Sequence, residues 1–134
     1  PMEELSGRVG TAAEKTCFHQ MKESFSPDLA EKEREAGHEM YEILLFHSPL
    51  FFETCRKWGA DLTLSGHIHG GIVRIPGIGG VITTSYRLFP KYDGGYYEQN
   101  QKKMIVSRGL GSHTIPVRLF NPAELVVIDL VTEE

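Results

Sequence analysis

Two apolar runs that each lead into histidine decide the fold: E-I-L-L-F-H-S-P at 42–49 and D-L-T-L-S-G-H-I-H-G-G at 61–71. Within them, the nearly continuous apolar stretches at 43–46 and 62–64 are typical of strands buried on both faces of a sheet. We therefore expect two neighbouring strands, each followed directly by imidazole side chains.

The connection between the two runs predicts a helix. Ser48 and Pro49 fit a helix start, the residues at 50–58 are compatible with a helix, and Gly59 fits its end. A strand, a helix and a second strand form a β-α-β unit, in which the two strands are parallel. Both strands should therefore finish at the same edge of one sheet.

Three histidines follow these strand ends. His47 comes after the first strand, and His67 and His69 come after the second, at the edge where open α/β sheets hold their ligands. In extended backbone, residues two apart point to one face, so His67 and His69 should face together. Gly66, Gly70 and Gly71 allow a tight turn that brings backbone close to a ligand. We expect the three imidazoles to converge on a catalytic zinc, iron, copper or nickel site, because neutral imidazole binds these metals. The alternative for an isolated H-x-H is packing or surface chemistry.

Four sequence blocks occur in a fixed order: L-L-F-H-S-P, W-G-A-D-L-T-L-S-G-H-I-H-G-G, S-R-G-L-G-S-H-T-I-P-V-R and N-P-A-E-L. Together they resemble the C-terminal half of calcineurin-like metallophosphoesterases, in the bacterial phosphodiesterase branch, over about residues 41 to 130. The resemblance implies an α/β fold, the C-terminal half of an αββα sandwich, with the β-α-β unit followed by mostly antiparallel strands. Composition sets apart a charged helical segment, 1–40, with nine acidic and five basic residues, from the metallophosphoesterase part, 41–134.

The same resemblance implies a site for two divalent ions, such as manganese, iron or zinc. It assigns His47 and His67 to one ion and His69 to the other. Paired ions of this kind lie about 3.5 to 4 Å apart and clamp both oxygens of an in-line displacement at phosphorus. The family's first half supplies the motifs D-x-H, G-D-x-x-D and G-N-H, which do not occur in this sequence. We expect this chain to lack a complete catalytic set, to need that N-terminal half and to be inactive alone.

Other residues are candidates for substrate contact. Arg108 opens the R-G-L-G-S-H-T turn, which the resemblance places near the metals, and its guanidinium suits phosphate oxygens. The alternative for Arg108 is a structural salt bridge. His113 and Arg118 are weaker candidates from the same block. A predicted loop at 86–97 also suits an organic phosphate, with a solvated hairpin as the alternative; its candidate residues are Arg87, Lys91, Tyr92, Tyr96 and Tyr97.

The remaining elements are read from capping and periodicity. Thr11 and Glu14 fit a capping box that opens a helix carrying Phe18, Met21 and Phe25 at helical spacing. A second, polar helix is expected at 26–40. Further strands are expected from apolar runs bounded by turn residues, at 72–75, 81–84, 104–107 and 125–130.

Composition excludes several classes of function. The net charge is -4, with no basic patch of the kind that binds nucleic acid. No apolar run approaches the about 20 residues needed to span a membrane. Cys17 and Cys55 are too few for a disulfide scaffold and are expected to be reduced packing residues. The compartment is undetermined. Cytoplasm is the default expectation, and any signal or anchor would precede residue 1.

Three functional classes stay open at this point. The first is a metal-dependent phosphodiesterase or phosphomonoesterase, with a phosphoester as substrate. The second is a metal-poor scaffold that uses the same fold to bind proteins, and the third is a small metal-binding module unrelated to phosphate. If the chain is such a C-terminal fragment, its sheet lacks the flanking strands, and the unpaired edges predict self-association of the chain.

Overall fold

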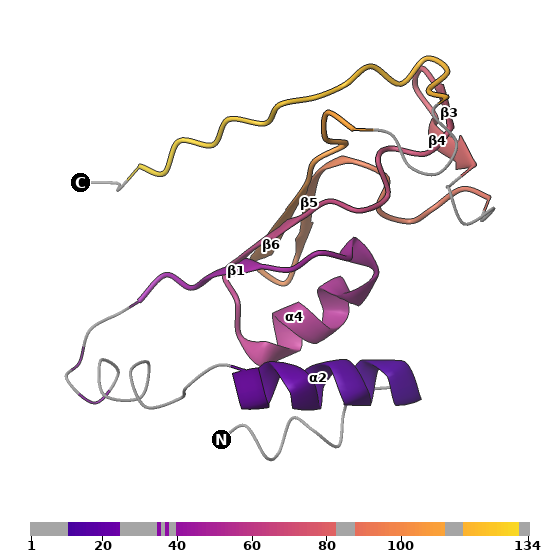
Figure 1. The fold of residues 1–134 in the computed structure, drawn as a ribbon. Helices are drawn as coiled ribbons and strands as arrows, with labels where there is room; N and C mark the ends of the chain where they lie inside the picture. Colours follow the sequence, from indigo (N-terminus) through magenta and orange to yellow (C-terminus); the bar gives the residue numbers. More distant parts are fainter. Residues whose placement is uncertain are drawn as a thin grey trace.

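The structure is a computed structural model of the 134-residue chain, and it describes residues 11–24, 35, 37, 40–82, 88–111 and 117–131. Figure 1 shows two helices stacked on one side of a sheet, a separate hairpin beyond the sheet and an extended C-terminal segment. The elements are α2 (Ala12–Ser24), β1 (Ile43–Leu45), η1 (Pro49–Phe51), α4 (Phe52–Trp58), β2 (Leu62–Ser65), β3 (Val73–Ile75), β4 (Gly79–Ile82), β5 (Gly95–Gln99) and β6 (Lys102–Val106).

The sheet confirms the predicted β-α-β unit. Its strand order is β1-β2-β6-β5, and β1 runs parallel to β2, with Ile43 paired with Leu62. The next strand, β6, is also parallel to β2, whereas β5 is antiparallel to β6. The α/β class is therefore confirmed. The strands after the unit pair mostly antiparallel, as expected, and the parallel pairing of β2 with β6 is the exception.

The crossover between β1 and β2 begins and ends close to the predicted residues. Pro49 opens a short 3-10 turn that leads into α4, and Gly59 ends the helix with a φ of 128°, which favours glycine. The Gly59 N–H donates to the Cys55 carbonyl at 3.2 Å. Ser48 occupies the position before the first turn, but its side chain makes no capping hydrogen bond. The start of the crossover therefore depends on proline and not on a serine cap.

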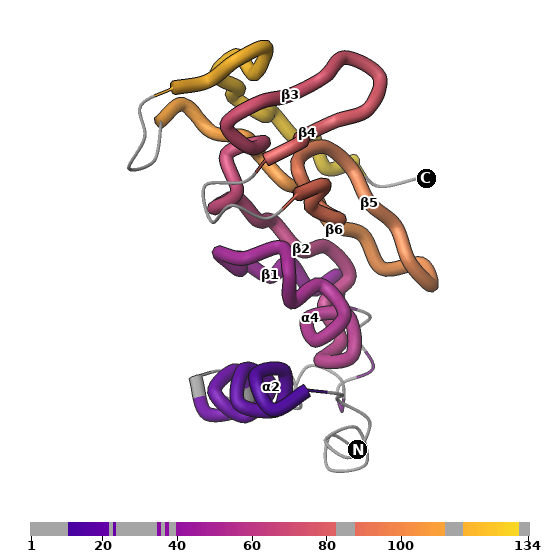
Figure 2. Tube along the Cα trace, turned by 90° about the vertical axis from the view of Figure 1, so that its right-hand side faces the viewer, coloured from indigo at the N-terminus to yellow at the C-terminus, as the bar shows by residue number. Residues whose placement is uncertain are grey.

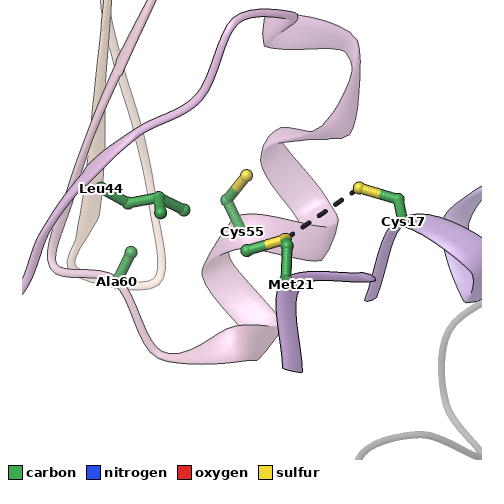
Figure 3. Packing of buried hydrophobic residues seen from close by; sticks show 5 residues of the cluster. All are labelled: Cys17, Met21, Leu44, Cys55 and Ala60. Carbon is green, nitrogen blue, oxygen red and sulfur yellow. Dashed lines mark hydrogen bonds between the residues drawn. The ribbon is translucent and has the colours of Figure 1, made fainter. Parts of the chain in front are cut away.

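The first core cluster joins α2 and α4 to the sheet. Cys17 and Met21 of α2 pack with Cys55 of α4, Leu44 of β1 and Ala60, as Figure 3 shows. Both cysteines are buried free thiols, as expected, and burial raises the pKa of Cys55 to about 12. These cysteines therefore contribute packing, and their thiols are protonated at neutral pH.

The second core cluster contains Phe52, Tyr92, Met104 and Val106, with Tyr97 packed against it. Phe52 comes from α4, whereas Met104 and Val106 come from β6. The α4 helix thus contributes residues to both clusters, which ties it to the sheet through Leu44 on one strand and Met104 on another.

The N-terminal helix carries the predicted capping box. The Glu14 N–H donates to Thr11 Oγ1 at 3.3 Å, and the Thr11 N–H donates to Glu14 Oε2 at 2.7 Å. Phe18 and Met21 are buried, as their spacing predicts. Phe25 lies outside the described residues, as does most of the second helix expected at 26–40.

Two predicted elements differ in the structure. Part of the predicted loop at 86–97 is strand β5, because Gly95–Gln99 pairs along β6. The predicted strand at 125–130 pairs with no strand among the described residues, and Leu125 and Val127 are 78% and 79% exposed. Figure 1 shows this segment running away from the hairpin on its own. Its apolar composition suits a strand, but a strand forms only where a second backbone is in register with it.

The β3–β4 hairpin lies at the end of the molecule opposite α2, as the turned view in Figure 2 also shows. It was expected at 72–75 and 81–84. The second strand begins earlier, at Gly79, and residues 83–84 lie outside the described part of the chain. No helix within the described ranges is long and apolar enough to cross a membrane.

Candidate metal centre

His47 and His67 lie together at the carboxyl edge of the sheet. Their ring centroids are 4.5 Å apart and the ring planes meet at 60°. The backbone beside them continues the pairing of β1 with β2, because the Phe46 N–H donates to the Leu64 carbonyl at 2.9 Å and the Gly66 N–H donates to the His47 carbonyl at 3.2 Å. The parallel pairing therefore brings together two imidazoles that are 20 positions apart in the chain.

A hollow of about 330 Å³ opens at the same edge. It is lined by Leu45, Phe46, His47, Leu64, Ser65 and Gly66. The Ser65 hydroxyl donates to the Phe46 carbonyl at 2.7 Å and so joins the two strands at the wall of the hollow. A hollow at the carboxyl ends of neighbouring parallel strands is the usual place for a ligand in such a fold.

The loop that carries His67 and His69 is not extended. His67 and His69 have φ values of 69° and 52°, and Gly70 and Gly71 have φ values of 71° and 86°. The argument from alternating side chains in extended backbone is therefore wrong, because this turn is left-handed. Ile68 between the two histidines is buried, as expected.

The donor atoms are suited to a transition metal, and the histidine pair fits part of a ligand set. Two imidazoles at one sheet edge are ligands that zinc, iron, copper and nickel accept. Within the described ranges, no three His, Cys, Asp or Glu side chains form a group that could hold a metal. The structure therefore pairs His47 with His67, and the assignment of His69 to a second ion stays a prediction.

The glycines of this loop are not equivalent. A Cβ built on Gly70 would lie 2.7 Å from Asn121 Oδ1 and 2.8 Å from Arg108 Cδ, in addition to the positive φ. A Cβ on Gly71 would lie 2.7 Å from the Ile82 carbonyl oxygen. Gly66, by contrast, would meet only the Ser107 carbonyl oxygen, at 3.8 Å, and has no positive φ. Glycine is therefore required at Gly70 and Gly71 by the positive φ and by the close approach of other parts of the chain, and neither reason applies at Gly66.

Arg108 forms the salt bridge that was the alternative to its substrate role. Its Nη2 donates to Glu124 Oε1 at 2.6 Å, and its backbone N–H donates to Glu124 Oε2 at 3.1 Å. The hydrogen bond from Arg108 lowers the pKa of Glu124, and the same bond raises the pKa of Arg108. The contact of Arg108 with a phosphate stays a prediction.

Arg118 donates hydrogen bonds to backbone carbonyls. Its Nη1 donates to the Gly109 carbonyl at 3.0 Å, and its Nη2 donates to the carbonyls of His69 and Arg108 at 2.9 and 2.6 Å. It therefore joins the histidine loop to the turn that begins at Arg108. His113, the other weak candidate from this block, lies outside the described residues.

Sequence reasoning missed Asn121 as a residue of this site. Its amide Nδ2 donates to the carbonyls of His69 and Gly71, both at 2.6 Å, and the side chain is buried. The N-P-A-E-L block was visible in the sequence, but a short polar motif with no periodicity does not indicate which distant backbone it will contact. Within this block, Asn121 binds the backbone of the histidine loop, and Glu124 binds Arg108.

The tyrosines of the predicted substrate loop divide between core and surface. Tyr92 is buried and packs edge-on against Phe52 and Tyr97. The Tyr97 hydroxyl donates to Asp93 Oδ1 at 3.0 Å. Tyr96 is exposed, whereas Arg87 lies outside the described residues. Tyr92 and Tyr97 are therefore structural, and the remaining candidate residues of this loop stay predictions.

Known proteins with similar sequences share one description. The chain is 31% identical over 105 residues to an uncharacterized metallophosphoesterase, YkuE, of Bacillus subtilis, a match that covers 78% of this chain and 36% of that protein. It is 37% identical over 91 residues to an uncharacterized metallophosphoesterase of Aquifex aeolicus, covering 67% of this chain and 33% of that protein.

The chain belongs to the metallophosphoesterases. A third relative, the uncharacterized metallophosphoesterase Cj0846 of Campylobacter jejuni, is 33% identical over 107 residues, which cover 79% of this chain and 27% of that protein. This metallophosphoesterase chain thus spans about one third of the length of the curated relatives it matches. No protein-family model and no solved structure matches it.

We predict that alanine is tolerated at Gly66 and not at Gly70. Gly70→Ala should lower the free energy of unfolding by about 1–3 kcal/mol, because the new Cβ meets Asn121 and Arg108 in a left-handed conformation. Gly66→Ala is the matched control and should change it by less than about 0.5 kcal/mol. Urea denaturation of both variants measures the difference, and equal losses would contradict this account of the loop.

The Arg108–Glu124 pair predicts a pH dependence. Because the folded state lowers the pKa of Glu124, the pair stabilises the fold above the unfolded-state pKa of about 4.3, and this contribution is lost as pH falls through the folded-state pKa. The stability difference between wild type and Glu124→Gln should therefore be largest at neutral pH and shrink below about pH 4.3. Unfolding midpoints between neutral and acid pH measure it. Asp129→Asn, an exposed acid on the same segment, should follow wild type throughout.

Proposed function

We propose that this chain is the C-terminal part of a calcineurin-like metallophosphoesterase that hydrolyses phosphodiesters or phosphomonoesters. The observation that carries the proposal is the His47–His67 pair, with ring centroids 4.5 Å apart at the carboxyl edge of two parallel strands. The names of the sequence relatives support the same chemistry. His47 and His67 are proposed to share one divalent ion, and His69 to bind a second.

His47 and His67 are the residues of this chain proposed to hold a metal ion. When bound, divalent ions stabilise developing charge on phosphoryl oxygens and activate water. His47 and His67 are suited to hold such an ion because each follows a strand of the same sheet, so the backbone sets their separation. Rigid placement of this kind is what a metal site requires.

Arg108 is proposed as the contact to a phosphate oxygen of the substrate. A guanidinium carries five N–H donors, and the bond from Nη2 to Glu124 Oε1 uses one of them. Pairing with Glu124 and binding a phosphate are therefore compatible, and the carboxylate fixes the direction of the guanidinium. Because the pair is about neutral overall, Arg108 would contribute hydrogen-bond geometry more than net charge.

The chain is proposed to be inactive alone. Neutral imidazoles do not offset the charge of two divalent ions, and the carboxylate motifs D-x-H and G-D-x-x-D are not in this sequence. The match to about one third of each relative supports the view that the full protein supplies them. Loss of one of these imidazoles should then lower the activity of the full protein far more than loss of an exposed histidine elsewhere.

We predict metal-dependent hydrolysis of bis-p-nitrophenyl phosphate by the full-length protein with added manganese. His67→Ala should lower kcat/KM about 100-fold or more, because a bound metal contributes several kcal/mol of transition-state stabilisation. His19→Ala is the matched control, since His19 lies exposed on α2 and pairs with Glu23 at 3.2 Å. Equal activity of the His67 variant and wild type would refute the assignment. Metal binding without hydrolysis would favour the metal-binding module. The absence of both metal binding and hydrolysis would favour the protein-binding scaffold.

We also propose that this chain, separated from the remainder of the protein, self-associates. The outer edge of β1 pairs with no strand among the described residues, and Leu45 on it is 76% exposed. Unpaired edges beside exposed apolar side chains recruit other chains. Sedimentation velocity should show a dimer or larger species, and Leu45→Lys should shift the population toward monomer. A monomer at every concentration would contradict the proposal.

A further inference from the structure

The segment 118–124 holds both turns at the rim of the sheet. Arg118, Asn121 and Glu124, spaced three residues apart, all direct their side chains onto backbone or an arginine of those turns. The Glu124 N–H also donates to the Gly109 carbonyl at 3.0 Å. The histidine loop and the turn at Arg108 are therefore linked through one short segment of chain.

Asn121 is the residue of this segment that the histidine loop depends on most directly. It is 2% exposed, and its Nδ2 donates to the carbonyls of His69 and Gly71. Its Oδ1 lies against Gly70, where a Cβ would approach within 2.7 Å. The orientation of the amide follows from chemistry, because the reversed amide would place oxygen against two carbonyl oxygens.

The backbone that Asn121 holds is unusual. His67 and His69 have positive φ values without being glycine, and such conformations persist only where the surroundings impose them. Asn121 and Arg118 both donate to the His69 carbonyl, at 2.6 and 2.9 Å. These two donors, the buried Asn121 and the half-buried Arg118, oppose any rotation that would bring the loop back to the common extended conformation.

We propose that Asn121 is a positioning residue for metal binding, an inference that rests on the proposed function. By holding the carbonyls of His69 and Gly71, its amide sets the turn from which the imidazoles of His67 and His69 project. Its side chain donates to backbone carbonyls, so the proposed role is to position the histidines and not to bind the metal itself. Arg118, which lies in the same segment as Asn121, donates to the same His69 carbonyl.

The decisive variant is Asn121→Asp in the full-length protein. It keeps the size of the side chain but replaces the donating NH2 with a carboxylate oxygen that repels both carbonyls. The dissociation constant for Mn²⁺, measured by calorimetric titration, should rise about 10- to 100-fold, the usual loss when a partner of the ligand shell is removed. Asn121→Ser removes the donor without adding charge and should move the constant in the same direction, which covers the case in which the aspartate variant does not fold.

The control separates positioning from general stability. Lys102→Met breaks the Lys102–Asp61 pair, 2.6 Å apart, at the end of the sheet away from the histidines. With unfolding midpoints of the metal-free proteins measured alongside, Lys102→Met should lose stability and keep its Mn²⁺ constant within about twofold of wild type. Unchanged Mn²⁺ affinity in both Asn121 variants, or an equal loss in Lys102→Met, would overturn the proposal.

A metal-free measurement separates this inference from the proposed function. Nuclear Overhauser contacts between the imidazole protons of His47 and His67 should be present in wild type and in Lys102→Met and should be lost in Asn121→Asp. If wild type binds no metal, the proposed function fails and these contacts still test the loop. Contacts that persist in Asn121→Asp would show that Asn121 does not position the histidines.

Discussion

The parallel pairing of β1 with β2 is the constraint on which this structure depends. Ile43 is paired with Leu62 and Leu45 with Leu64, so both strands reach the carboxyl edge in step. The Phe46 N–H and the Gly66 N–H continue the pairing beyond the strands themselves. A slip of one residue would turn every side chain of a strand to the other face and separate the two imidazoles. The backbone ladder thus sets the separation of the two imidazoles.

The helices keep this ladder in place from one face of the sheet. The α4 helix packs through Cys55 toward Leu44 and Ala60, and through Phe52 toward Met104. The α2 helix then covers α4 with Cys17 and Met21, which Figure 3 shows as a buried sulfur-rich contact. Because apolar burial carries no direction, these clusters hold the layers together but do not decide where the histidines point. The backbone of the histidine loop is instead held by polar contacts at the rim of the sheet.

The rim is assembled from residues late in the chain. Arg118 and Asn121 both donate to the His69 carbonyl, and Glu124 holds Arg108 by its side chain and its backbone. A left-handed turn at two histidines is costly in isolation, so its persistence requires such donors. The metallophosphoesterase blocks G-H-I-H-G-G and N-P-A-E-L, which look independent in the sequence, are therefore parts of one contact.

By itself, the sequence determined what local spacing controls. The capping box of Thr11 and Glu14, the glycine that ends α4 and the β-α-β unit follow from neighbours in the chain and were predicted correctly. The pairing of β2 with β6, the left-handed turn at His67 and the Asn121 contact were decided only by the tertiary structure. The reason is physical: Asn121 and its acceptors His69 and Gly71 are 52 and 50 residues apart, and only the folded chain brings a buried amide against those carbonyls. The same holds for 125–130, whose strand-like pattern requires a partner backbone that its own residues do not provide.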